Sequence, residues 1–250
     1  MEILDPDTGL PVLLRALHVL AGVTWIGLLY YFNVVQVPSF AAYGDEARAR
    51  TVSIDKLARR ALWWFRWSAL VTLILGLLML GVINDYMKGF MTDTAAIGLG
   101  HSAAILVGML LGLTMATNVW MVIWPQQRTV LANAANVLGG AEADPAAAGA
   151  GRRALLASRA NFIFSIPMLW FMVASAHLYG AHDSAGNAWV FVLIAVVLGA
   201  VIELAALGML GGTAATNKLL WPFETHRNAM ITGGVLFVVL YLLSEGLIIL

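Results

Sequence analysis

The sequence predicts an all-α fold, a polytopic helix bundle embedded in a membrane, on three observations. Its 250 residues are 61% hydrophobic and 11% charged, whereas soluble domains are about 45–50% apolar and about 25% charged. A membrane helix needs about 20 mostly apolar residues. Six stretches of about that length or longer contain no charged residue or only a single carboxylate. Acidic and basic residues number 14 each, so no basic excess points to nucleic acid as a partner.

The predicted transmembrane helices follow these six stretches, trimmed at turn and interface residues. They cover about residues 11–37, 61–83, 96–124, 160–180, 188–212 and 227–248. The first stretch is expected to remain as helix one, because its apolar run is too long for a cleaved signal peptide. The Gly-rich stretch 139–151 predicts a flexible cytoplasmic loop over about 126–158, inside a single transmembrane domain of residues 1–250.

Lys and Arg lie mostly on one side of the predicted bundle. Only Arg15 and Lys88 fall on the side of the termini, against twelve on the other side. The positive-inside rule therefore predicts that both termini are outside, which is the periplasmic face if the membrane is the inner (plasma) membrane of a Gram-negative bacterium. Membrane lipid is then a direct partner of this multi-pass chain.

Three of the five histidines fall at a comparable depth near the outer leaflet. His18 lies about two turns into helix one, His101 one to two turns into helix three, and His177 in the last turn of helix four. Two facing histidines can occupy both axial positions of a haem iron, so we expect two of the three to ligate haem b. The alternative is that each imidazole only hydrogen-bonds across helices, as polar residues in membranes often do.

The neighbours of these histidines fit a haem pocket. Arg15 lies one turn outside His18, where its guanidinium can pair with a propionate. Trp25 lies two turns inward of His18 on the same face, and Trp170 has the same relation to His177, so both can form walls. Without cysteine, the chain cannot attach a c-type haem covalently.

A second polar group lies toward the cytoplasmic ends of the helices. Its amide and guanidinium side chains suit an oxygen-rich heterocycle or an anionic head group, and the candidate substrate contacts are Asn33, Arg66, Asn118, Arg159 and Asn161. Snorkelling arginines and amide bonds between helices explain the same residues equally well. Glu203, predicted in the middle of helix five, should be protonated or paired and could belong to a proton path.

Four strings in the chain resemble the membrane part of one family. They are LHVLAGVTWIGLLYYFNVVQVPSF, ALWWFRWSALVTLILGLL, TNVWMVIWPQQR and ASRANFIFSIPMLWFMVASAH. In this order they resemble the bacterial urate oxidase N-terminal family, the PuuD-type urate hydroxylases, over roughly residues 14–180. The first helix is also distantly similar to the HemJ-type protoporphyrinogen oxidases, which bind haem b.

The resemblance implies cytochrome-linked oxidation of urate to 5-hydroxyisourate, since longer family members carry a fused C-terminal c-type cytochrome. The positions that match the family's polar and aromatic pattern are His18, Trp25, Asn33, Arg66, Asn118, Trp124, Arg159, Asn161 and His177. Because the sequence holds no Cys-x-x-Cys-His, we expect electrons to pass to a separate cytochrome c or a respiratory complex. The alternative is a non-catalytic accessory subunit of a larger respiratory or photosynthetic membrane assembly.

Overall fold

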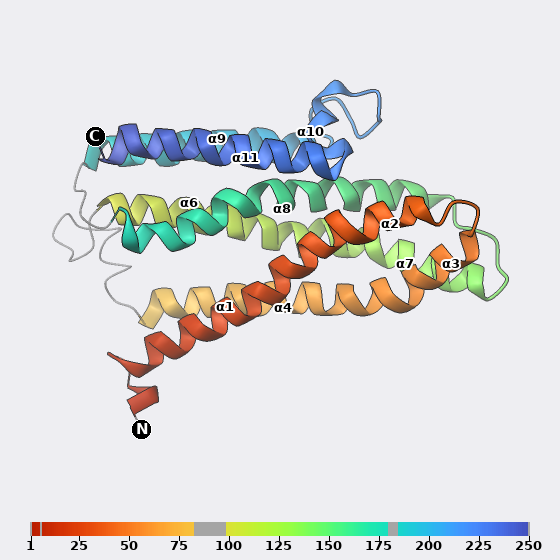
Figure 1. Cartoon of the computed structure of the whole chain (residues 1–250), viewed down its shortest axis with the longest axis horizontal. Helices are drawn as coiled ribbons and strands as arrows, with labels where there is room; N and C mark the ends of the chain where they lie inside the picture. Colours follow the sequence, from red (N-terminus) through yellow and green to blue (C-terminus); the bar gives the residue numbers. More distant parts are fainter. Residues whose placement is uncertain (1, 6, 83–98, 180–184, 250) are drawn as a thin grey trace.

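The structure, a computed structural model, describes residues 2–5, 7–82, 99–179 and 185–249, and these residues contain helices and no strand. Six helices are long and apolar enough to cross a membrane: Gly9–Ala42, Ala47–Gly81, Leu99–Leu138, Ala146–His177, Asn187–Ala206 and His226–Ile249. The predicted all-α membrane bundle is therefore confirmed. Both termini lie at one end (Figure 1), which we call the N/C end; the other is the arginine-rich end. Which end faces the cytoplasm stays a prediction.

Several spans are built from consecutive α and π segments. The first is α1 (Gly9–Tyr30), η2 (Tyr31–Gln36) and α2 (Val37–Ala42), after a short η1 (Glu2–Leu4). The second is α3 (Ala47–Val52), η3 (Ser53–Ala58) and α4 (Arg59–Val82), and the third is α6 (Leu99–Thr117), η4 (Asn118–Ile123) and α7 (Trp124–Leu138). The remaining elements are α8 (Ala146–His177), α9 (Ala185–Ala206), η5 (Lys218–Leu220), α10 (Trp221–Glu224), α11 (His226–Ser244) and η6 (Glu245–Ile249).

The helices form three layers, with α6 and α8 in the middle, α1 and α4 on one side, and α9 and α11 on the other (Figure 1). In α8, 67% of the most apolar window is buried, against 39% or less in each of the other five spans. Helix α8 is therefore the central element, and the rest of the bundle packs around it.

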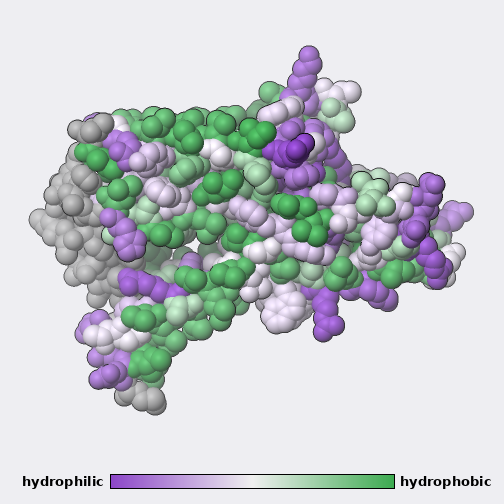
Figure 2. All heavy atoms as spheres, in the orientation of Figure 1, coloured by the Kyte–Doolittle hydropathy of each residue, from purple (hydrophilic) through white to green (hydrophobic). Residues whose placement is uncertain are grey.

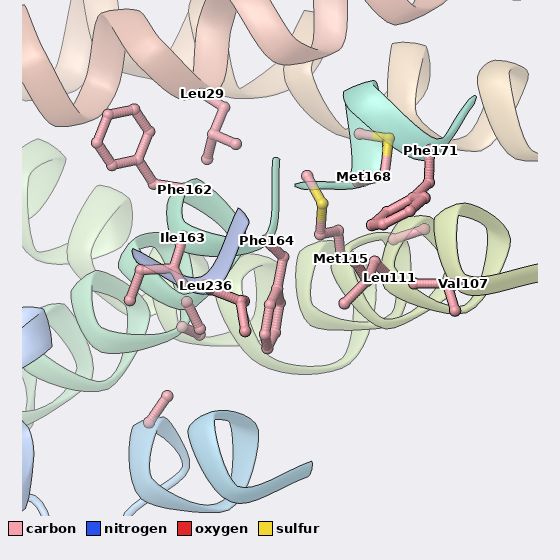
Figure 3. Close-up of a cluster of buried hydrophobic side chains, with 14 of the residues drawn as sticks. Leu29, Val107, Leu111, Met115, Phe162, Ile163, Phe164, Met168, Phe171 and Leu236 are labelled. Atoms are coloured by element: carbon pink, nitrogen blue, oxygen red, sulfur yellow. The ribbon is translucent and has the colours of Figure 1, made fainter. Parts of the chain in front are cut away.

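The core contains large side chains of α8 that pack against the neighbouring helices (Figure 3). Phe162, Phe164 and Phe171 are completely buried. They lie among Leu29 from α1 and Met115 from α6, both also completely buried. The outward faces of the other helices keep large apolar side chains exposed, as contact with lipid requires (Figure 2).

The prediction of a flexible loop over about 126–158 is wrong. Helix α7 continues to Leu138 and α8 begins at Ala146, so the non-helical part is only residues 139–145. The segment was too polar for a membrane span, but its Ala, Leu, Gln and Arg residues are good helix formers outside one. The turn is closed by the Asp144 backbone N–H, which donates to Asn133 Oδ1 at 2.7 Å.

Other helix ends also differ from the predicted ones. The second span begins at Ala47 rather than near 61, because a polar helix precedes its apolar part. Helix α9 ends at Ala206 rather than near 212, because Gly208 adopts φ +77° and the Met209 N–H donates to the Leu204 carbonyl. This is a glycine-terminated helix end. The predicted ends at 83, 96 and 180 lie outside the described residues.

Two aromatic runs that end in proline form wide π turns. Residues 31–36 precede Pro38, and residues 118–123 precede Pro125. Proline has no N–H to donate and its ring crowds the carbonyl four residues earlier, so a wider turn relieves both problems without breaking the helix. The first and third spans therefore continue past their prolines.

Gly233 sets the closest approach of α11 to α8. A Cβ atom at Gly233 would lie 2.9 Å from Ile166 Cδ1 and 3.0 Å from the Ile163 carbonyl oxygen, whereas one at Gly234 would meet nothing within 4 Å. We predict that Gly233→Ala lowers the free energy of unfolding by about 1–3 kcal/mol through overpacking. Gly234→Ala leaves it unchanged or raises it by up to about 1 kcal/mol. Thermal unfolding of both variants in detergent checks this prediction. Equal changes in stability for the two variants would contradict the close packing of α11 on α8 at Gly233.

Candidate functional site

His18 faces α4 from α1. Its Nδ1 donates to the backbone carbonyl of Thr72 at 2.9 Å. A Cβ atom at Gly76, one turn further along α4, would lie 3.3 Å from Cε1 of the His18 ring. A glycine at this position therefore leaves the space that the imidazole occupies.

His101 lies between α6 and α8 and is only 4% exposed. Its ring hydrogen-bonds to the backbone of Ser175 on α8. Both His18 and His101 therefore use one ring nitrogen to bond the backbone of a neighbouring helix. In metal sites the same arrangement orients an imidazole whose other nitrogen is the ligand.

His18 on α1 and His101 on α6 lie in different layers of the bundle (Figure 1). Tyr30 on α1 contacts Phe162 and Ser165 on α8. From this contact, His18 lies about three turns along α1 toward the N/C end. Ser175, the partner of His101, lies near the end of α8. The common depth that the sequence predicts for the two histidines stays a prediction.

His177 has a different setting. It is exposed in the last turn of α8, two residues beyond Ser175. Two residues correspond to about 200° around a helix, so its side chain leaves α8 on the side opposite Ser175. Of the three predicted ligands, the structure therefore holds two against neighbouring helices and leaves the third on the surface.

The surroundings of His18 and His101 fit a flat cofactor in most respects. Trp25 is buried, and its indole Nε1 has no hydrogen-bond partner among the described residues. Arg15 is exposed, on the turn before His18. Figure 2 shows an opening between the α1–α4 layer and the middle layer toward the N/C end. Trp170 does not join this site, because its ring packs on Phe237 and Tyr241 of α11.

The predicted polar group at the other end divides into separate contacts between helices. Asn33 donates to the Leu29 carbonyl and to Ser158 Oγ, both at 2.9 Å, which ties η2 to α8. The guanidinium of Arg66 lies over the Trp124 ring, 3.8 Å from its centroid. These two candidate substrate contacts therefore have protein partners on different helices.

Asn118 and Asn161 contact each other. Asn118 Nδ2 donates to Asn161 Oδ1 and to Glu203 Oε2, both at 2.9 Å, and Asn161 Nδ2 donates to the Met115 carbonyl at 2.9 Å. Glu203 lies in the last turn of α9, not in its middle as predicted, because α9 ends early at Ala206. The chain of bonds joins the third, fourth and fifth spans.

Arg159 points to α10. Its Nη1 donates to the carbonyls of Phe223 and Glu224, the last residues of that short helix. The five predicted substrate contacts thus lie at four places rather than around one site. Sequence reasoning missed the carbonyl partners of His18 and His101, because backbone atoms carry no residue signature.

The fold and these contacts define a multi-pass membrane helix bundle with two oriented imidazoles, the partly buried His18 and the buried His101. Residues 90–206 match the model of the family described as urate oxidase N-terminal. The match confirms the resemblance and includes His101, while His18 precedes it. No curated protein and no solved structure matches the chain.

The ion pair beside Arg159 predicts a pH dependence of stability. Arg152 donates two hydrogen bonds to Glu224, at 3.0 and 2.5 Å, and this holds the pKa of the Glu224 carboxyl below its ordinary value of 4.5. A lowered folded-state pKa stabilises the fold fully at pH values above the ordinary pKa, and this contribution is lost as the pH falls through the folded-state pKa. Because the pair is partly exposed, we expect Glu224→Gln to cost no more than about 1 kcal/mol at pH 7.

The measurement is thermal unfolding of wild type and Glu224→Gln between pH 7 and pH 3. The difference between the two proteins should begin to shrink as the pH falls below about 4.5, the ordinary pKa of a glutamate, and should be lost once the pH has fallen through the lower folded-state pKa of Glu224. A difference that stays constant over this range would show that the carboxylate charge does not stabilise α10.

Proposed function

We propose that the chain is a haem b-binding redox protein of a bacterial inner membrane, with His18 and His101 as axial ligands. The observation that carries the proposal is that each imidazole is oriented by a backbone atom of a neighbouring helix. Imidazole is a common haem ligand, so these two residues would hold the haem and the haem would supply one-electron chemistry. The family match over residues 90–206 supports the membrane-domain type of urate hydroxylase.

The residues around the histidines have distinct roles in this proposal. The Thr72 carbonyl and the Ser175 backbone fix the two ring planes, and Gly76 leaves room for the His18 ring. Trp25 offers a buried N–H donor, and Arg15 suits a propionate at the surface. A haem held there supplies one-electron transfer.

The proposed partner for electron transfer is a separate cytochrome c or a respiratory complex. Urate or a similar purine is the electron donor that the family match suggests. Asn33 lies 15 residues from His18 along the first span, or about 22 Å at 1.5 Å per residue. A substrate that reduces the haem therefore binds near the N/C end, away from the amide network.

One observation favours a second candidate, a non-catalytic accessory subunit. The amide and guanidinium groups that could contact a purine, Asn33, Asn118 and Asn161 among them, are engaged in bonds between helices. A scaffold that associates with a larger membrane complex needs those bonds and no substrate site. The two candidates differ in whether a substrate reduces the purified chain.

Single histidine variants test the ligand assignment. We predict that His18→Ala and His101→Ala each abolish or reshape the Soret band and the reduced α-band of the detergent-purified protein, because an axial ligand is lost. His177→Ala should leave both bands nearly unchanged, since His177 is exposed on the far side of α8. An unchanged spectrum in His18→Ala and His101→Ala, or no Soret band in wild type, would refute the assignment.

Anaerobic addition of urate to the oxidised wild-type protein separates the two candidates. Reduction of the haem by urate alone supports the oxidoreductase. A haem that dithionite reduces and urate does not supports the accessory or electron-transfer role.

Gly76 provides an independent test of the His18 ring position. A larger residue there must displace the imidazole, because even a Cβ atom would be 3.3 Å from its Cε1. We predict that Gly76→Val shifts the haem spectrum and lowers haem occupancy. Gly81→Val on the same helix is the matched control, because a Cβ atom there would meet nothing within 4 Å. Equal spectra for the two variants would argue against His18 as a ligand.

A further inference from the structure

Glu203 is a carboxyl group that the proposed redox function does not use. It lies in the last turn of α9, and its Oε2 accepts a hydrogen bond from Asn118 of η4 at 2.9 Å. Asn118 is 2% exposed and Asn161 is completely buried. The carboxyl is therefore turned toward the interior of the bundle, where three spans meet, rather than toward solvent.

The hydrogen bonds determine which atoms face the carboxyl. Asn161 Nδ2 donates to the Met115 carbonyl, so Asn161 Oδ1 is the atom presented to Asn118. Asn118 Nδ2 then lies between Asn161 Oδ1 and Glu203 Oε2. If the Asn118 amide were turned around, its oxygen would face these two oxygens without a proton between them. Glu203 consequently meets an N–H donor. A metal cation requires oxygen donors at that point, whereas a carboxyl that exchanges a proton keeps this bond in either state.

No cation neutralises the carboxylate within the described part of the chain, where Glu203 takes part in no ion pair. The elements packed against α9 are α6, α8, α11, η5 and η6. The charged group of α8 nearest to Asn161 is Arg159, which donates to carbonyls of α10. The other titratable groups of these elements are His101, Arg152, Arg153, His177, Lys218, His226, Arg227, Tyr241 and Glu245.

Two physical effects oppose a permanent negative charge on Glu203. The last turn of a helix carries the negative end of the helix dipole. Partial burial against apolar side chains removes water from the carboxylate. The single bond from Asn118 acts in the opposite direction, because it stabilises the charged form. Because these effects oppose one another, neither the charged nor the neutral carboxyl is strongly favoured, which suits a group that gains and loses a proton.

We propose that Glu203 is a proton-binding site near the arginine-rich end of the bundle, with Asn118 as the positioning residue that controls its proton affinity. The site is independent of the haem and goes beyond the proposed redox function. The ligand is one proton, bound on the carboxylate where α9 meets η4 and α8.

The experiment uses dicyclohexylcarbodiimide, which enters membranes and reacts with protonated carboxyl groups. The full-length protein in liposomes is labelled across pH 5–9, and the peptide containing Glu203 is quantified by mass spectrometry. We expect labelling that decreases as pH rises and that Glu203→Gln abolishes. Absence of label at every pH, or labelling independent of pH, overturns the proposal. Protection by Na⁺ at constant pH also overturns it, because a cation would then be the ligand.

Asn118→Ala tests the positioning role. Loss of a hydrogen bond to the carboxylate should move the labelling midpoint upward by about one to two pH units. Asn33→Ala is the matched control, since Asn33 is equally buried and bonds to Ser158 rather than to Glu203. Equal midpoints in Asn118→Ala and wild type refute the role of Asn118. If Asn118→Ala does not fold, pH-difference infrared spectra of wild type and Glu203→Gln provide the test, and a protonated-carboxyl band common to both refutes the proposal.

Discussion

Polar groups inside an apolar bundle need partners on other helices, and the arrangement of this molecule depends on how α8 supplies them. Ser158 accepts from Asn33, Asn161 joins Asn118, and the Ser175 backbone bonds to His101. Lipid offers no alternative partner for these groups. The first and third spans are therefore attached to one central helix at defined levels, and the fully buried Phe162, Phe164 and Phe171 fill the space between the bonds.

The same constraint separates two kinds of polar residue. Asn33, Asn118, Asn161 and Arg159 connect helices, and their donors are directed at protein atoms. His18 is different, because it bonds to the Thr72 carbonyl through one ring nitrogen and lies against Gly76. Amide groups thus stabilise the scaffold, whereas oriented imidazoles are the groups that suit a cofactor.

At the arginine-rich end, hydrogen bonds and ion pairs join segments that are far apart in the sequence. Arg59 donates to Asp55 Oδ1 and to the Leu131 carbonyl, which ties the second span to α7. Arg152 bonds to Glu224 and to the Thr213 carbonyl, which holds α10 and the preceding loop against α8. Local composition predicted a flexible loop at 126–158, but these long-range bonds and good helix formers make most of it helical.

The sequence by itself determined the class of protein and the number of spans, because hydropathy acts locally, and it carried the family resemblance that the match over residues 90–206 supports. Only the tertiary structure decided which side chains meet. It oriented His101 toward Ser175 and left His177 exposed, although the two histidines look equivalent in sequence. It also brought Glu203 to Asn118, because the rotation of each helix depends on packing against α8, which no single segment encodes.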